Sequence, residues 1–113
     1  MLDHIAIGVR NMSTSLEFYD EVLGKLGISR LIAYGGTDEL PDHVGYGSGQ
    51  KPDFWVGVNT PFQGYVHICL AAESRAAVDA FHAAALASGA SDNGRPGLRP
   101  HYHPGYYGAF VID

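Results

Sequence analysis

The chain has 113 residues, 46% of them hydrophobic, which suits one domain with a single core. Its 7 Lys and Arg residues against 12 Asp and Glu residues give a net charge of −5, which argues against a nucleic-acid partner. The single Cys69 has no disulfide partner, and neither a basic leader nor a membrane-length apolar run is visible, so we expect a cytoplasmic protein with no membrane partner.

The first half of the chain predicts a β-α-β-β-β order. Bulky apolar residues alternate with small or polar ones over residues 2–9, which predicts a strand. A helix is expected over residues 13–26, capped by Ser13 or Thr14. Three short strands follow, at Ser29–Tyr34, Val44–Gly47 and Phe54–Val58. Residues 59–64 form the expected linker.

The second half predicts the same order but stops early. Residues 65–72 alternate as the first strand does, and Ser74 is expected to cap a helix that runs to about Ala87. A Gly- and Pro-rich stretch, Gly94–Pro104, is expected as a loop before a strand at about residues 106–112. The last strand of this half has no residues to form it before the sequence reaches Asp113.

The two halves also match in sequence. Residues 3–7 resemble residues 66–70 at an offset of 63, and the same offset pairs Leu23 with Leu86. A period near 60 residues is too long for a solenoid repeat. We therefore expect one domain, residues 1–113, made of a module at 1–59 and an incomplete module at 65–113 that face each other across a concave site.

A histidine occupies the same place in each module. His4 and His67 lie on the face opposite the bulky apolar residues, where small neighbours leave room for a ligand. Neutral imidazole is the commonest metal ligand, but catalytic zinc and non-haem iron need a third protein ligand. The alternative is that each histidine is partly buried and bonded to a backbone carbonyl. The pattern leaves both possibilities open.

Five stretches carry a family resemblance: His4–Val9, Phe18-Tyr19, Leu23-Gly24, His67-Ile68 and Tyr107–Asp113. Together they resemble the glyoxalase/bleomycin resistance/extradiol dioxygenase superfamily, also called the vicinal oxygen chelate fold. The resemblance implies an α+β fold of two tandem βαβββ modules whose sheet curls around a cleft. Because this superfamily contains lyases, dioxygenases and metal-free drug-binding proteins, the resemblance does not select the reaction.

The resemblance also implies a site. In members similar to glyoxalase I, a divalent metal ion is held by residues on the first and last strand of each module. His4 and His67 match the two first-strand positions, whereas Trp55 stands at the last-strand position of the first module. The fourth position would lie beyond Asp113. Such proteins often build the cleft from two chains, which implies a homodimer.

Other candidate residues come from the chain itself. Trp55 either fills the core or forms a flat wall for a planar ligand. The polar run at 99–107 either covers a sheet edge or acts on a substrate. In the second case His103 is the catalytic proton carrier, and the substrate-binding residues are Trp55, Arg99, His101, Tyr106 and Tyr107. His43 and His82 are expected to be structural.

Two functions follow from this set of residues. The first is a metal-dependent enzyme, a lyase, isomerase or dioxygenase, that acts on a small oxygen-bearing organic substrate through a Lewis-acid metal. The alternative is a metal-free small-molecule binding protein of the bleomycin-resistance type. Metal analysis of the purified protein, repeated on His4→Ala, would separate them.

Overall fold

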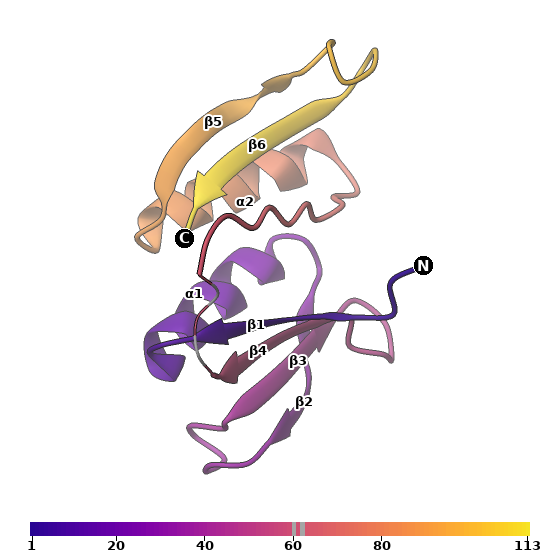
Figure 1. The fold of residues 1–113 in the computed structure, drawn as a ribbon. Coiled ribbons are helices and arrows are strands. Elements are labelled where there is room, and N and C mark those ends of the chain that lie inside the picture. Colours follow the sequence, from indigo (N-terminus) through magenta and orange to yellow (C-terminus); the bar gives the residue numbers. More distant parts are fainter. Residues whose placement is uncertain (60, 62) are drawn as a thin grey trace.

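A computed structural model describes residues 1–59, 61 and 63–113 (Figure 1). Thr60 and Phe62, in the expected linker, lie outside the described residues. The elements in chain order are β1 (Ile5–Val9), α1 (Met12–Gly24), β2 (Ser29–Tyr34), β3 (His43–Gly47), β4 (Phe54–Val58), α2 (Arg75–Ala87), β5 (Ser91–Leu98) and β6 (Tyr107–Ile112). The α+β fold class expected from the sequence is confirmed.

The first half forms a four-stranded sheet in the order β1-β4-β3-β2. β4 is parallel to β1 and antiparallel to β3, so it has a hydrogen-bonded neighbour on each side. The register places Trp55 opposite Ala6 on β1 and opposite Gly45 on β3. Gly57 lies opposite Gly8 and His43 in the same way. Paired residues share a face of a sheet, so these side chains form one surface.

Helix α1 begins one residue earlier than expected. Asn11 is its cap, because the Asn11 side-chain oxygen accepts from the backbone N–H of Thr14 at 3.0 Å. The expected cap at Ser13 or Thr14 is therefore wrong. The helix ends at Gly24, and Gly27 takes a left-handed backbone with φ 74° that lets Ile28 N–H donate to the Leu23 carbonyl at 3.0 Å.

Helix α2 has the expected bounds. The Ser74 hydroxyl accepts from the N–H of Ala77 at 3.1 Å, which confirms the predicted cap. The loop expected at Gly94–Pro104 is wrong in part, because β5 runs through Gly94 to Leu98 and pairs with β6. Its pairing register shifts on both sides of Gly94, which is how an edge strand accommodates glycine and proline.

Residues 65–72 are not a strand, although their alternation predicted one. They run as a coil between the two sheets (Figure 1). In the first half, β1 owes its pairing to β4. The described residues of the second half include no strand in the equivalent place, so this segment lacks a partner. Ile68 and Leu70 still pack against the core, so the predicted inward face was correct.

One core joins both halves. Its buried apolar residues come from α1, β3, β4 and α2, and they are Met12, Leu16, Val22, Leu23, Val44, Tyr46, Phe54, Val56, Ala84 and Ala85. Because α1 and α2 contact each other, the helices form one layer, and each sheet keeps one face turned away from it. No helix within the described residues is long and apolar enough to span a membrane.

Candidate functional site

The face of the first sheet that is turned away from α1 contains a hollow of about 190 Å³. We call it the Trp55 hollow, and it is lined by Ala6, Ile7, Gly8, His43, Trp55, Val56, Gly57 and Asn59. Its base is formed by the paired small residues of β1 and β4. Two rings, an indole and an imidazole, provide the large side chains of its lining.

Two glycines allow these rings to lie against the sheet. A Cβ atom on Gly57 would stand 2.3 Å from His43 Nδ1, and one on Gly45 would stand 2.9 Å from Trp55 Cζ2. Any side chain at either position would therefore displace the ring above it. Glycine inside a strand weakens the strand and often marks a close approach. Here the approach is that of the two rings that line the hollow and, at Gly45, also that of Pro52, whose Cβ would lie 2.8 Å away.

Trp55 is half-buried and is not among the buried core residues. Its indole stacks on the ring of Tyr34 from β2, with the centroids 5.8 Å apart and the planes 6° from parallel. Tyr34 is 55% exposed, so this stacked pair borders solvent. The geometry favours the ligand-wall alternative for Trp55 over the core alternative.

A second group of expected site residues lies in the second half. His67 meets Phe110 edge to face at 5.7 Å, and Tyr102 meets Tyr106 at 4.9 Å. Tyr102 also contacts Phe110 at 6.5 Å, which connects His67 to Tyr106 through a series of rings. The hydroxyl of Tyr106 lies 3.8 Å from Cys69 Sγ, and this hydrogen bond raises the pKa of Tyr106.

The remaining residues of the 99–107 run bond to the chain around them. Arg99 donates to the Arg95 carbonyl at 2.7 Å and lies over the Phe110 ring at 5.5 Å. His103 Nδ1 lies 2.9 Å from the carbonyl oxygen of Pro104. The ring of His101 lies 4.5 Å from that of Tyr102. The side chains that were expected to bind a substrate thus partly contact the β5–β6 hairpin to which they belong.

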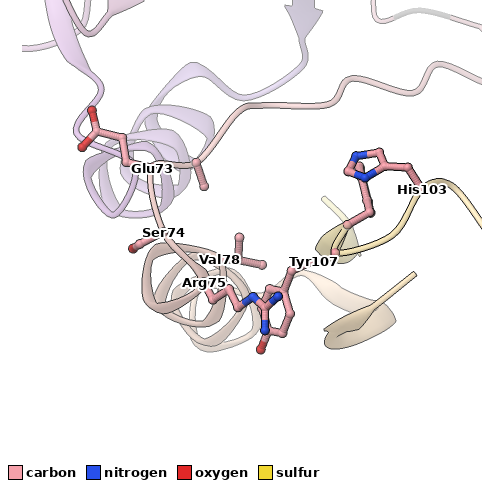
Figure 2. Close-up of a pocket in the computed structure, with 9 residues that line it drawn as sticks. Glu73, Ser74, Arg75, Val78, His103 and Tyr107 are labelled. Carbon is pink, nitrogen blue, oxygen red and sulfur yellow. The ribbon is translucent and has the colours of Figure 1, made fainter. Parts of the chain in front are cut away.

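A larger hollow, of about 260 Å³, lies at the start of α2. We call it the Arg75 hollow, and it is lined by Ala72, Glu73, Ser74, Arg75, Val78, His103, Gly105, Tyr106 and Tyr107. Figure 2 shows Glu73 pointing away and Arg75 lying against Tyr107, 5.2 Å from its ring centroid. The Tyr107 hydroxyl donates to Asp79 at 2.6 Å, and this hydrogen bond raises the pKa of Tyr107. Arg75 and Tyr107 are already engaged by neighbouring side chains and Glu73 points away, so we favour the Trp55 hollow.

The two candidate metal ligands have separate partners. His4 Nδ1 lies 2.8 Å from the Asp3 carboxylate, and His67 Nδ1 lies 3.1 Å from the Tyr65 hydroxyl. A catalytic zinc site needs three protein ligands, and the described part of the chain contains no group of three His, Cys, Asp or Glu residues that could hold a metal. The donor set here does not fit such a centre, and the metal role of these histidines stays a prediction.

His82 is structural, as expected. It is 7% exposed and its Nε2 lies 3.0 Å from the Asp92 carboxylate. The exposed ring of His43 lines the Trp55 hollow, so the structural role expected for it stays a prediction. The sequence around His43 holds no signal for this, since its place follows from the pairing of β3 with β4.

Comparison with known proteins identifies the family. The chain is similar to the crystal structure of a glyoxalase/bleomycin resistance protein from Albidiferax ferrireducens T118, with 30% sequence identity and a TM-score of 0.78. The match covers 100% of this chain and 90% of that chain. No protein-family model and no curated protein matches the sequence. With this identity over its full length, the chain belongs to the glyoxalase/bleomycin resistance protein family.

Proposed function

We propose that this protein binds a small planar molecule in the Trp55 hollow, as a metal-free binding protein of the bleomycin-resistance type. The observation that carries the proposal is the hollow itself, in which Trp55 and His43 stand over a base of small residues. Stacking on an indole suits a flat ligand, because offset and edge contacts between rings add to apolar burial.

The size of the hollow supports one ring. An engineered apolar cavity of about 150 Å³ in another protein holds a single benzene molecule. The Trp55 hollow, at about 190 Å³, therefore has room for one six-membered ring with a small substituent. A ligand with two fused rings would have to extend beyond the lining residues.

The test is a ligand-detected NMR screen of single-ring aromatic compounds against the wild type, Trp55→Ala and Tyr102→Ala. Tyr102 is a matched control because it is a 54% exposed aromatic residue of the second half. Loss of ring contacts worth about 0.5–1.5 kcal/mol should weaken binding roughly 3- to 10-fold in Trp55→Ala. Tyr102→Ala should bind as the wild type does. The opposite pattern would place the site in the second half and contradict the proposal.

The metal-dependent enzyme is a second candidate, and one observation favours it. Both His4 and His67 have Nδ1 engaged, which leaves Nε2 to bind a metal, and metal-bound histidines commonly use such an arrangement. The metal would polarise the oxygen atoms of a small organic substrate. A third ligand is what the described residues lack.

Elemental analysis of purified protein tests this candidate. If a divalent metal copurifies with the wild type and with His101→Ala but not with His4→Ala, the enzyme candidate gains. Trp55→Glu adds a carboxylate and should then raise zinc affinity, because it completes a set of two histidines and one carboxylate. No copurified metal and no gain in affinity would leave the binding protein as the better account.

A further inference from the structure

We infer that His43 selects the ligand of the Trp55 hollow, and that the hollow takes an uncharged ring whose hydroxyl group meets the imidazole. This inference rests on the proposed function of the hollow and assigns its substrate class, a phenol. His43 is then a residue that determines specificity, a role the sequence pattern did not indicate.

The first step is the chemistry of the lining. Among the described residues that line the hollow, only His43 and Asn59 have side-chain hydrogen-bond acceptors. Trp55 offers an N–H donor alone, and the other side chains are apolar or absent. Neutral imidazole has one donor and one acceptor nitrogen, so it can pair with a hydroxyl group in either direction.

The second step is the position of the imidazole. Its Nδ1 lies above Gly57, where a Cβ atom would stand 2.3 Å away, so the ring is held close to the sheet. His43 is nonetheless exposed, and no hydrogen bond, ion pair or ring contact joins its side chain to another residue of the described chain. A ligand in the hollow would therefore meet an imidazole that no residue of the described chain already binds.

The repeat gives His43 an equivalent residue in the second half. The offset of 63 residues maps His43 onto Tyr106 and Ala6 onto Cys69. In the second half, the Tyr106 hydroxyl is engaged by Cys69 at 3.8 Å. In the first half the corresponding partner is Ala6, whose methyl group cannot form a hydrogen bond. At this repeated position, Tyr106 in the second half has a hydrogen-bond partner within the chain. His43 in the first half is left to bind a ligand.

The charge of the lining also bears on which ligand can bind. None of the described residues that line the hollow is Asp, Glu, Lys or Arg. An ionised ligand would lose hydration there without gaining an opposite charge, which is costly, whereas a hydroxyl group needs only one hydrogen-bond partner. The lining therefore favours a neutral phenol over a carboxylate of the same size.

The experiment compares phenol with toluene, which replaces the hydroxyl group with a methyl group of similar size. Both are titrated into the wild type, His43→Phe and His43→Gln while the indole N–H signal of Trp55 is followed by NMR. His43→Phe keeps a ring above Gly57 but removes both nitrogens. Its phenol affinity should fall roughly 3- to 10-fold, the value of one hydrogen bond, while its toluene affinity stays the same or rises.

His43→Gln restores a donor and an acceptor and should recover part of the phenol affinity. Tyr102→Phe, which removes a hydroxyl group in the second half, should bind both compounds as the wild type does. Equal changes for phenol and toluene in His43→Phe, or no change for either, would overturn the role of His43 and leave the hollow itself supported. If neither compound shifts the Trp55 signal of the wild type, the hollow and the inference both fail.

Discussion

The two halves of the chain form the same helix in different surroundings. α1 and α2 each have 13 residues, their bounds are related by the offset of 63, and the equivalent residues Asn11 and Ser74 cap them in the same way. The equivalent leucines differ, because Leu23 is fully buried whereas Leu86 is 39% exposed. The cap and the bounds of the helix thus repeat with the sequence, whereas the burial of its side chains depends on the sheet on which each helix packs.

The sheets differ because, among the described residues, only the first half contains a strand in the place of β4. β4 pairs with β1 and β3 through backbone hydrogen bonds. In the second half, the described residues show no backbone pairing of residues 65–72 with β6. Side chains make the contact instead, Cys69 with Tyr106 just before β6 and His67 with Phe110 in β6. An alternating apolar pattern thus sets which face is buried, but a strand forms only where a partner supplies the ladder.

The largest expected effect compares the two leucines. Leu23→Ala should lower the free energy of unfolding by about 3 kcal/mol, because it leaves a cavity in the shared core. Leu86→Ala should cost less than about 1 kcal/mol, because part of its side chain is already in water. Urea unfolding measures both. Equal losses would mean that the two helices are packed alike and would remove the difference on which the comparison depends.

The second prediction concerns residues 65–72. Their backbone makes no hydrogen bonds within the described chain, so their amides should exchange with solvent well before those of β4. Hydrogen exchange detected by mass spectrometry on dilute protein measures this. Protection equal to that of β1, in a sample shown to be monomeric, would contradict the unpaired state.

We also propose that a second copy of the chain covers residues 65–72, which makes the protein a homodimer. Tyr65 and Val66 are 83% and 53% exposed, and unpaired apolar edges favour association. Protection of residues 65–72 should then rise with protein concentration, together with the melting temperature and the mass measured by light scattering. A melting temperature that does not depend on concentration would argue for a self-sufficient monomer.

The smallest expected effect is a pH dependence. The backbone N–H of Gly94 and the His82 side chain lower the pKa of Asp92 below its usual 3.8. The stabilisation from a lowered carboxylate pKa is complete above the unfolded value and disappears as the pH falls through the folded value. Asp92→Asn should therefore remove part of the stability loss seen as the pH falls below 3.8, measured by urea midpoints.

Asp3 is the matched residue of the first half, since His4 and Lys51 lower its pKa in the same direction. Asp3→Asn should flatten the acid response in the same pH range. If both variants respond to acid as the wild type does, these carboxylates do not contribute to the acid sensitivity of either half.

Much of the fold was predictable from the sequence, for reasons particular to each element. The bounds of β2, β4 and α2 were correct because turn residues and the Ser74 cap mark their ends. β5 was missed because its Gly94 and Pro96 are typical of loops. Residues 65–72 were assigned wrongly because alternation indicates which face is buried without revealing whether a neighbouring strand exists.

The candidate site was only partly predictable. The place of Trp55 in the lining of the hollow was predictable because it shares a face with Gly57, which follows from the alternation along one strand. His43 was missed because its place over Gly57 depends on the register between β3 and β4, and one strand's sequence does not determine that register. Tyr106 and Tyr107 were taken as one group, and both line the Arg75 hollow, but their hydroxyl groups have different partners, Cys69 and Asp79 respectively.

Trp55 is the only tryptophan of the chain, so its indole N–H signal reports directly on binding to the first half. The most direct measurement is an amide and indole NMR map of the wild type with a bound single-ring compound. The account predicts that the Trp55 indole signal and the amides of β1 and β4 shift together and saturate at one concentration. Shifts confined to β5, β6 and the Arg75 hollow, with the Trp55 signal unchanged, would contradict it.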